Sequence, residues 1–464
     1  MQYNTERIVN FAAKLPNGIA PNSRMELRQT PECGGVNYCM EGNYKHRVVD
    51  ALLERKLLGK GAVLVEGAKW CGKTTTSSRL AKSILKLGET SVLRSSRQLA
   101  EMNPALLLRG ETPRLIDEWQ TIPILWDSVR SEVDDRSLMG QFILTGSAVP
   151  VDSDEIEHTG TGRIGRLMMR PMSLWESGES NGAISLGSLF DEPKEIFAEN
   201  KLDIEQLAYL TCRGGWPQAS MLDGDVALDQ ARDYFDSVVH YDIQRTDGVD
   251  RDPERVKLLM RSYARHQGAA VNYSVICADM KTNDNSSLND DTVASYVKAL
   301  KKIFVVEDMR AWNPNLRSKT AVRTSDTRYF TDPSIGVAAL GIGPKDFLND
   351  LNTFGLFFET MAVRDLRVFA DPLDGELYHY RDKNGLECDA VLHRRNGTYG
   401  LIEIKLGGEG LIEEGAANLK SLAEKIDTTR MKAPSFMMVL TGTGAYAYRR
   451  KDGVYVVPIG CLKD

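Results

Sequence analysis

From residue 44 to about 180, apolar positions follow two spacings, one typical of helices and one typical of buried strands. Val48, Val49, Leu52 and Leu53 recur at helical spacing, and a short apolar run at 62–65, a glycine-rich turn and a second helix follow. Segments of helical length separate the further strands that we predict, at 91–93, 114–116, 141–144 and 167–169. Strands that alternate with helices predict an α/β fold with a parallel sheet covered on both faces.

The pattern changes beyond residue 180. It is mostly helical to about 265, and helices at 256–265, 273–280 and 291–303 precede two β-rich segments, 304–312 and 328–331. Three helices followed by a β-hairpin suggest a winged helix. After residue 345 the order helix, three strands, helix, strand and hairpin indicates a separate α/β domain. We predict an arm (1–43), a parallel-sheet core (44–180), a helical lid or linker (181–244), a winged-helix domain (245–344) and a C-terminal α/β domain (345–464).

Composition and charge exclude several classes of protein. The 464 residues are 42% hydrophobic and 26% charged, which is ordinary for folded multidomain proteins. Lys and Arg total 58 against 64 Asp and Glu, a net charge of −6, which argues against a polyanion-binding surface over the whole chain. The seven cysteines form no C-x-x-C pair, and no apolar run is long enough to span a membrane. We therefore expect a cytoplasmic protein without membrane contact.

Residues 67–74, GAKWCGKT, fit the pattern G-x-x-x-x-G-K-[ST], with a strand before it and a helix after it. Backbone N–H groups of such a loop wrap a β-phosphate at the positive end of the following helix. Lys73 is expected to neutralise β- and γ-phosphate oxygens, and the Thr74 hydroxyl to bind Mg²⁺. The predicted nucleotide-binding set is Gly67, Ala68, Lys69, Trp70, Cys71, Gly72, Lys73, Thr74 and Thr75.

Two further strand ends carry polar residues suited to phosphate chemistry. The strand at 114–116 runs into Asp117 and Glu118; we expect Asp117 to hold Mg²⁺ through water and Glu118 to orient and deprotonate the attacking water. The next strand ends in Thr145 and Ser147, and either hydroxyl could sense the γ-phosphate or simply close a turn.

Arg163 and Arg166 stand in a glycine-rich stretch before the fifth predicted strand. An arginine at this place can reach a phosphate bound by a neighbouring subunit and stabilise charge that develops during transfer. Both could also be solvated surface arginines.

The segment from Arg245 to Arg328 carries 15 Lys and Arg against 11 Asp and Glu, so it is locally basic. In a winged helix, the third helix and the wing are the elements that meet DNA. The basic residues at these elements are Lys298, Lys301, Lys302, Arg310, Arg317, Lys319, Arg323 and Arg328. The same charges could be solvated on a winged helix that docks a protein.

Four residues of the C-terminal domain have the chemistry of a metal-dependent phosphodiesterase. Glu359 falls on a helix, Asp389 on one strand, and Glu403 and Lys405 two apart on the next strand. Such an enzyme needs carboxylates at Mg²⁺ and a lysine beside the attacking water. A two-residue turn between the strands would put Asp389 opposite residue 404, on the wrong face. A three-residue loop with a left-handed Gly397 brings Asp389 to the face of Glu403, and the apolar pattern favours it.

The blocks GAKWCGKTT, LIDEWQTIPILWDSVR, ILTGSAVP and GRIGRLMMRPMSLWE resemble the AAA+ ATPases of bacteria and archaea that carry a C-terminal domain of the PD-(D/E)XK nuclease type. The resemblance covers about 44–464. It implies a P-loop AAA+ sheet core, ATP and Mg²⁺ as cofactors, ADP as product, and Arg163 as the arginine supplied to a neighbouring subunit in a homo-oligomer. Asp389, Glu403 and Lys405 match the D…E-x-K signature of the nuclease type, and Glu359 its helical acid.

The expected function is therefore that of a Mg·ATP-dependent ATPase coupled to a winged helix and a nuclease-like domain, acting on double-stranded DNA. A true ATP-gated endonuclease remains open. The rival from another class is a nucleotide-controlled module that docks a protein partner through an inactive nuclease-like domain.

Overall fold

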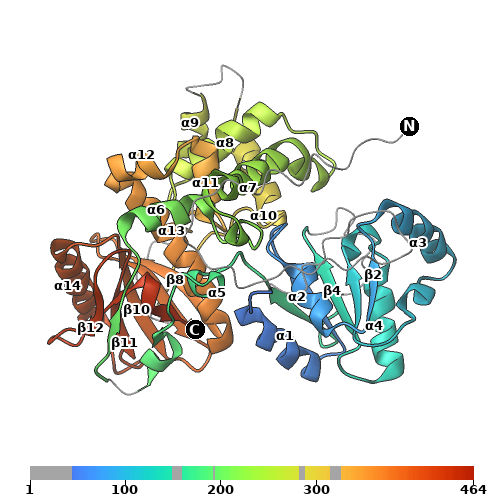
Figure 1. Cartoon of the computed structure of the whole chain (residues 1–464), viewed down its shortest axis with the longest axis horizontal. Coiled ribbons are helices and arrows are strands. Elements are labelled where there is room, and N and C mark those ends of the chain that lie inside the picture. Colours follow the sequence, from blue (N-terminus) through green and yellow to red (C-terminus); the bar gives the residue numbers. More distant parts are fainter. Residues whose placement is uncertain (1–43, 149–158, 192–193, 282–287, 314–324) are drawn as a thin grey trace, which may run out of the picture. The chain divides into compact units, whose positions relative to one another are not determined.

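The computed structural model describes residues 44–148, 159–191, 194–281, 288–313 and 325–464 (Figure 1). The first sheet is parallel and has the strand order β2-β3-β4-β1-β5. Its strands are β1 (Ala62–Glu66), β2 (Ser83–Lys86), β3 (Arg114–Asp117), β4 (Phe142–Gly146) and β5 (Ile164–Met168). The predicted α/β fold with a parallel sheet is confirmed.

Alternation along β1 shows how this sheet is covered on both faces. Val63 and Val65 pack into a cluster with apolar residues of α1 (Val48–Gly59). Ala62 and Leu64 point the other way, into a cluster with Trp126, Val129 and Val133 of α4 (Leu125–Arg136). Since successive side chains of a strand face opposite sides, a continuous apolar run such as 62–65 is what a sheet buried on both faces requires.

The strand predicted at 91–93 is wrong. These residues lie in α3 (Thr90–Met102), and the strand before them is β2. Val92, Ser96 and Leu99 continue at helical spacing, which a three-residue window does not reveal. The strand β2 lies at the sheet edge, and its four residues alternate between exposed and half-buried positions, so its apolar signal is weak.

The middle of the chain is helical. Its helices are α6 (Ile204–Arg213), α7 (Gly224–Ser237), α8 (Pro253–Arg265), α9 (Tyr273–Lys281), α10 (Asp290–Lys302), α11 (Pro333–Leu340) and α12 (Pro344–Asn349). Two antiparallel bridges, Val306 to Phe330 and Met309 to Thr327, join the β-rich segments that follow α10. The three helices α8–α10 lie where the sequence places them; the winged-helix assignment stays a prediction.

A mixed seven-stranded sheet forms the C-terminal region, with the order β7-β12-β13-β11-β10-β9-β8. Its strands are β7 (Phe197–Glu199), β8 (Gly375–Arg381), β9 (Glu387–Arg394), β10 (Tyr399–Lys405), β11 (Phe436–Thr441), β12 (Tyr446–Arg449) and β13 (Tyr455–Pro458). One face packs against α13 (Leu351–Ala370) and the other against α14 (Glu409–Lys425). The element order matches the order predicted after residue 345.

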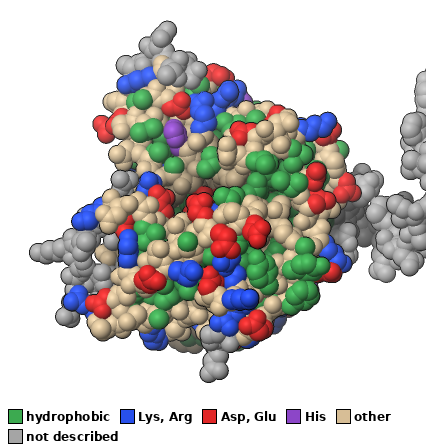
Figure 2. All heavy atoms as spheres, turned by 90° about the vertical axis from the view of Figure 1, so that its left-hand side faces the viewer, with side chains coloured by type: hydrophobic (Ala, Val, Ile, Leu, Met, Phe, Trp, Pro, Cys, Tyr) green, Lys and Arg blue, Asp and Glu red, His purple; other side chains and the backbone are tan. Residues whose placement is uncertain are grey.

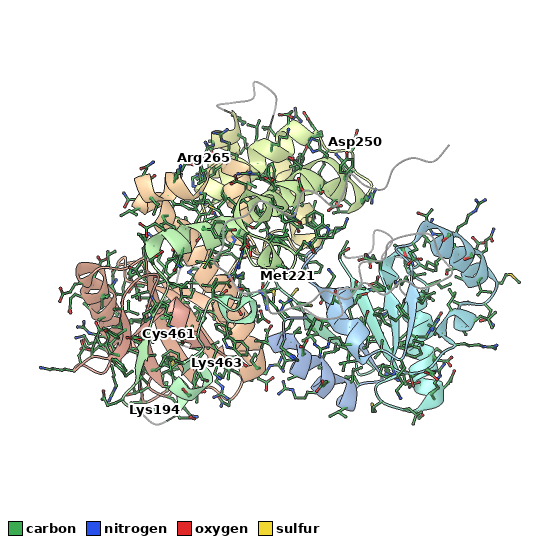
Figure 3. All side chains as sticks on the ribbon, in the orientation of Figure 1. Lys194, Met221, Asp250, Arg265, Cys461 and Lys463 are labelled. Atoms are coloured by element: carbon green, nitrogen blue, oxygen red, sulfur yellow. The ribbon has the colours of Figure 1, made fainter. Side chains whose placement is uncertain are left out.

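The segment predicted as a helical lid or linker (181–244) begins with two short strands and not with a helix. The strand β7 pairs with β12, and β6 (Ile184–Ser185) pairs with the last strand, β14 (Leu462–Lys463), so residues 184–199 complete C-terminal sheets. Figure 3 labels Cys461 and Lys463 at this end of the chain. Strands of two and three residues leave no local period when their partners are far away, 249 positions from Ala198 to Ala447 and 278 from Ile184 to Leu462, so the sequence pattern misses them.

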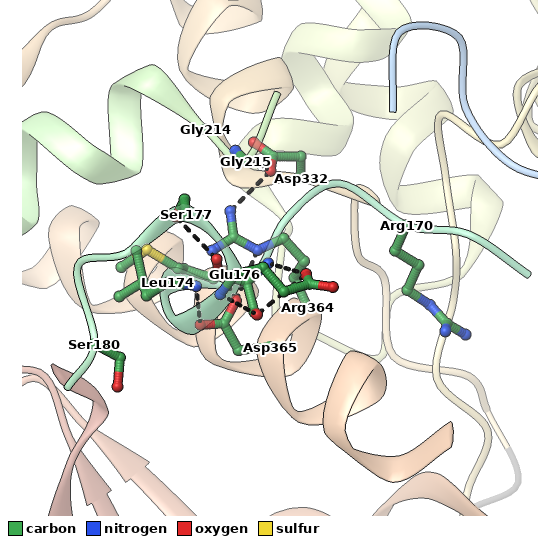
Figure 4. A network of polar contacts seen from close by, with 12 residues as sticks. Arg170, Leu174, Glu176, Ser177, Ser180, Gly214, Gly215, Asp332, Arg364 and Asp365 are labelled. Atoms are coloured by element: carbon green, nitrogen blue, oxygen red, sulfur yellow. Dashed lines mark hydrogen bonds and ion pairs between the residues drawn. The ribbon is translucent and has the colours of Figure 1, made fainter. Parts of the chain in front are cut away.

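The helical region and the C-terminal sheet share one core. Apolar residues of α8, α11 and α13 belong to the same buried cluster as the α13-facing residues of β9 and β10. A buried polar network crosses this core: Arg364 pairs with Asp332 and Asp365, and Asp365 also accepts the Leu174 N–H (Figure 4). Among the described helices, none has both the length and the apolar character needed to cross a bilayer.

Candidate functional site

The loop at 67–72 leaves the end of β1 and enters α2 (Lys73–Leu80). A Cβ on Gly67 would lie 2.0 Å from the carbonyl oxygen of Met169, so only glycine allows this close approach. Gly72 has φ 103° and caps α2 in the left-handed region, which glycine adopts without steric cost. The glycines of the predicted phosphate loop are therefore required by its backbone.

The Lys73 side chain lies under the loop. Its Nζ donates to the carbonyl oxygens of Gly67, at 2.9 Å, and Ala68, at 2.7 Å, and the residue is buried. The ammonium group is thus held beside the loop, where phosphate oxygens would replace these carbonyls as partners.

The Asp117 carboxylate gathers two hydroxyls. Its Oδ1 accepts from Thr74 Oγ1 and from Thr145 Oγ1, both at 2.6 Å. The structure therefore brings together the two groups predicted at Mg²⁺, Thr74 and Asp117. Thr145 is fully buried, and its hydroxyl contacts Asp117 rather than standing alone at the strand end.

Glu118 has a strained backbone, and two hydrogen bonds fix its side chain. Its φ of 59° and ψ of 45° are left-handed, a conformation that costs a non-glycine residue about 1–3 kcal/mol and persists only where surrounding contacts fix it. Oε2 accepts from Ser147 Oγ at 2.9 Å and from Gln120 Nε2. The predicted base is thus oriented by two donors, one of which, Gln120, the sequence reasoning did not single out.

The remaining loop residues have different surroundings. Ala68 and Cys71 are buried, and Thr75 is exposed. Lys69 forms an ion pair with Asp242, and the half-exposed Trp70 ring meets Tyr234 edge to face at 5.6 Å between centroids. Lys69 and Trp70 therefore contact the helical region.

Arg47, directly before α1, also holds the phosphate loop and was missed by the sequence analysis. Its Nη1 donates to the Cys71 carbonyl at 2.8 Å, its Nη2 to the Arg170 carbonyl at 2.7 Å, and its Nε pairs with Glu176 at 3.0 Å. The side chain is buried, so these contacts are shielded from water. No motif marks this residue, because its partners lie 24 to 129 positions away.

Arg163 lies at the sheet edge opposite to the phosphate loop. It directly precedes β5, whose last residue pairs with the last residue of β1. At about 3.3 Å per residue, the five residues of β5 separate Arg163 from the loop by about 17 Å, farther than an arginine side chain extends. It forms an ion pair with Asp134 at 2.8 Å. Arg166, in the middle of β5, pairs with Glu66 at 3.2 Å and lies over the Trp126 ring. Neither arginine completes the site of its own chain.

Several basic residues predicted to meet DNA are already paired. Lys301 and Arg328 both form ion pairs with Asp308, and Arg310 pairs with Glu376. Lys298 is exposed and Lys302 half-buried, while Arg317, Lys319 and Arg323 lie outside the described residues. On the face shown in Figure 2, basic and acidic side chains are interspersed. The local excess of positive charge is therefore largely compensated among the described residues.

The three-residue loop between β9 and β10 is confirmed. Residues paired across these strands, such as Ala390 with Ile402 and Leu392 with Gly400, have numbers that sum to an even value. The Arg394 N–H bonds the Thr398 carbonyl, and Gly397 has φ 81°, so the loop is 395–397. This register puts Asp389 on the face of Glu403.

Asp389, Glu403 and Lys405 form one cluster. Lys405 Nζ lies 2.7 Å from Glu403 Oε2 and 3.6 Å from Asp389 Oδ2, and Asp389 also accepts the Ile404 N–H at 2.7 Å. Glu403 is 1% exposed, and its Oε1 has no hydrogen-bond partner among the described residues. Burial, and then the charge of Asp389, raise the pKa of Glu403. The ammonium group of Lys405 is the cation that balances the two carboxylates.

Glu359 comes from α13, on the opposite face of the sheet. Its Oε1 accepts the Tyr329 hydroxyl, and a Cβ on Gly268 would lie 2.9 Å from this carboxylate. Burial, and then the charge of Asp389, raise the pKa of Glu359. In the described part of the chain, however, no group of three or more His, Cys, Asp or Glu side chains is arranged to hold a metal ion. The role of Glu359 as a metal ligand stays a prediction, and Asp389 and Glu403 share one face of the sheet.

Comparison with known proteins divides the chain into three matched regions. Residues 59–177 match the family described as AAA domain, residues 204–346 match a domain of unknown function, DUF8612, and residues 354–462 match another, DUF4143. The parallel sheet, the phosphate loop and the first match together support a P-loop fold of the AAA type for residues 59–177. The nuclease-like assignment at the C-terminus stays a prediction.

Two relatives resemble most of the chain. Uncharacterized proteins of Mycobacterium bovis and Mycobacterium tuberculosis are each 24% identical over 366 residues, which span 78% of this chain and 74% of theirs. Among solved structures, the Walker-type ATPase of Pyrococcus abyssi, at 14% identity, covers 62% of this chain and 94% of its own with a TM-score of 0.40. A structure of Drosophila ORC bound to DNA, at 13% identity, covers 63% and 85% with a TM-score of 0.16.

Proposed function

We propose that the chain binds Mg·ATP at the loop 67–75 and hydrolyses it to ADP and phosphate. The convergence of Thr74 and Thr145 on Asp117, each at 2.6 Å, beside the buried Lys73 carries this proposal. A hydroxyl and a carboxylate at this place fit Mg²⁺, which keeps several waters and takes few protein ligands. When bound, Mg²⁺ neutralises charge on the β- and γ-phosphates.

Each residue then has a separate task. Lys73 exchanges the carbonyls of Gly67 and Ala68 for phosphate oxygens, and the loop N–H groups bind the β-phosphate. Glu118 accepts a proton from the attacking water, since Ser147 and Gln120 hold its carboxylate at the same sheet edge.

An arginine from a second copy of the chain completes this site in the proposal. Arg163 is too far from the loop of its own chain, and it is exposed where a neighbouring subunit could meet it. Its positive charge would stabilise the transferring phosphoryl group. We therefore propose a homo-oligomer, in which Arg163→Ala leaves ATP binding intact and lowers hydrolysis. Unchanged turnover in this variant would remove Arg163 from the mechanism.

Steady-state ATP hydrolysis at low salt tests the proposed activity, with Lys73→Ala as the blank. We expect turnover that requires Mg²⁺ and is lost in Lys73→Ala, in which ATP binding is weakened as well. If the wild-type protein hydrolyses no more ATP than Lys73→Ala, the proposal is wrong.

A second candidate function rests on the C-terminal acid cluster. We propose that Asp389 and Glu403 bind one Mg²⁺, with Lys405 beside the attacking water, for cleavage of DNA. Two carboxylates on one face and the buried Glu403 Oε1 without a partner support the proposal. One or two carboxylates with waters satisfy this ion, so Glu359 is not needed as a ligand.

Manganese binding and DNA cleavage test this second function separately. We expect Mn²⁺ to bind the wild-type protein and, more weakly, Asp389→Ala, with cleavage of linear double-stranded DNA abolished in the variant. Both proteins are measured without nucleotide and with Asp117→Ala as background, because Thr74 and Asp117 are the groups proposed to hold the metal ion at the ATP site. If neither Mn²⁺ binding nor DNA affinity depends on Asp389, a protein-docking role of this domain is favoured.

A further inference from the structure

Gln120 lies in the short turn Trp119–Thr121 that follows Glu118, and its side chain returns toward the phosphate edge of the sheet. The amide Nε2 donates to Glu118 Oε2. An ionised carboxylate only accepts hydrogen bonds, so the NH₂ end of the amide must face Glu118 and the carbonyl end must face away. This contact therefore fixes the orientation of the amide.

The other end of the same amide has no partner. Gln120 Oε1 is buried without a hydrogen-bond partner among the described residues. A buried carbonyl oxygen without a donor is unfavourable unless water or a ligand supplies one. Gln120 Oε1 is therefore a site where a water molecule or a ligand that donates a hydrogen bond can bind.

Gly146 shows where this oxygen lies. A Cβ on Gly146 would stand 3.0 Å from Gln120 Oε1. Gly146 is the last residue of β4, pairs with Glu66 at the end of β1, and follows Thr145, which contacts Asp117. The free amide oxygen is thus at the strand ends that also carry the phosphate loop and Asp117.

The two polar residues at the end of β4 are already engaged. Thr145 donates to Asp117 Oδ1 and Ser147 donates to Glu118 Oε2. Both hydroxyl protons are therefore used, so neither residue can donate a hydrogen bond to a water molecule or to the γ-phosphate, the role that the sequence suggested for them. Gln120 supplies an acceptor at the same edge.

We propose that Gln120 is a catalytic residue of the ATPase site, whose amide oxygen accepts a hydrogen from the attacking water while its NH₂ group holds Glu118. This inference rests on the proposed ATP hydrolysis. The water oxygen forms a bond to the γ-phosphorus as the bond to the β,γ-bridging oxygen breaks. The electron pair leaves with ADP, one water proton passes to Glu118, and the second stays hydrogen-bonded to Gln120.

Single-turnover ATP hydrolysis and equilibrium ATP binding, measured on the full-length protein, test this role. Gln120→Leu removes both ends of the amide at nearly constant volume. We expect the hydrolysis rate to fall about 10²-fold, in the range for loss of a group that directs proton transfer, while the dissociation constant for ATP changes less than about 2-fold. The control is Gln98→Leu on α3, an exposed glutamine for which we expect the wild-type rate.

Gln120→Glu separates this role from a merely structural one. The variant keeps an acceptor but puts a second carboxylate beside Glu118, and like charges disfavour ionisation. We expect the acid limb of the pH–rate profile to move to higher pH, with ATP affinity retained. This variant also carries the test if Gln120→Leu fails to fold.

The outcomes distinguish this inference from the function on which it rests. If the wild-type protein hydrolyses ATP and both Gln120 variants do so at its rate with its pH profile, the role of Gln120 is overturned. If the wild-type and Gln98→Leu proteins hydrolyse no more ATP than Lys73→Ala, the proposed ATPase function itself fails. Loss of ATP affinity in Gln120→Glu in parallel with the rate would also overturn the catalytic role.

Discussion

Replacing Arg364 by methionine would break the most deeply buried ion-pair network among the described residues of α13 (Figure 4). The guanidinium lies 2.9 Å from Asp332 and 2.7 Å from Asp365, and all three side chains are at most 1% exposed. Methionine keeps much of the volume and removes the charge. Two carboxylates are then left in the core without their cation.

The structure allows the size of the effect to be worked out. Each of the two ion pairs contributes about 4 kcal/mol at an effective dielectric constant of about 20 and a separation of about 4 Å between charge centres. Removing the guanidinium also recovers several kcal/mol of its desolvation cost. The free energy of unfolding should therefore fall by about 3–5 kcal/mol, the range found when one partner of a buried ion pair is removed.

The loss should also depend on pH. Burial raises the pKa of Asp365 to about 6 even beside Arg364, and removal of that cation raises it further. A carboxyl whose pKa is higher in the folded than in the unfolded state makes folding less favourable as the pH rises from about 4 through the folded pKa. The penalty in Arg364→Met is therefore larger at pH 8 than at pH 5.

Urea unfolding followed by tryptophan fluorescence and circular dichroism measures this penalty. Trp216 donates to Ser334, which in turn bonds Asp332, so its emission reports on the network. The matched control is Arg232→Met, which breaks an ion pair with Asp229 that is more than half exposed on both sides; we expect a change within about 0.5 kcal/mol. A loss below about 1 kcal/mol in Arg364→Met, or one independent of pH, would refute the reasoning.

Two further predictions concern the candidate sites. Gly67→Ala should abolish ATP binding with little change in circular dichroism, because its methyl group would lie 2.0 Å from the Met169 carbonyl oxygen. The control Gly59→Ala has open space around the added methyl group and should bind ATP normally. A fluorescent ATP analogue measures binding to both variants. Glu403→Gln removes a carboxyl whose pKa is raised by burial and by Asp389, so the variant should gain stability relative to wild type as the pH rises from about 4.3 to 8. Urea unfolding at pH 5 and pH 8 checks this, and parallel curves for both proteins would contradict it.

The phosphate loop and the β9–β10 register could be predicted because both are local. The loop is a contiguous motif, and the register follows from the parity of apolar positions around three loop residues, 395–397. Side chains alternate between the two faces of a strand, so a register that buries both Ala390 and Ile402 puts Asp389 and Glu403 together on the other face.

Other parts of the site could not be predicted, because their partners are distant in sequence or their chemistry depends on a side-chain orientation. Arg47 contacts the Cys71 carbonyl and Glu176, and nothing in its own neighbourhood marks it. Gln120 is adjacent to Glu118, but its free oxygen is visible only once the amide orientation is known. Likewise, the sequence does not show that Lys301 and Arg328 both form ion pairs with Asp308.

The contacts of Arg47 also show why boundaries drawn on the sequence near residue 180 do not separate independent units. Arg47 joins the Cys71 carbonyl of the phosphate loop to Glu176, and two residues earlier the Leu174 N–H bonds Asp365 of α13. All of these groups are buried, and a polar group removed from such a network leaves its partner unsatisfied. A fragment that ends at residue 180 would therefore lose the Asp365 carboxylate of α13 that accepts the Leu174 N–H.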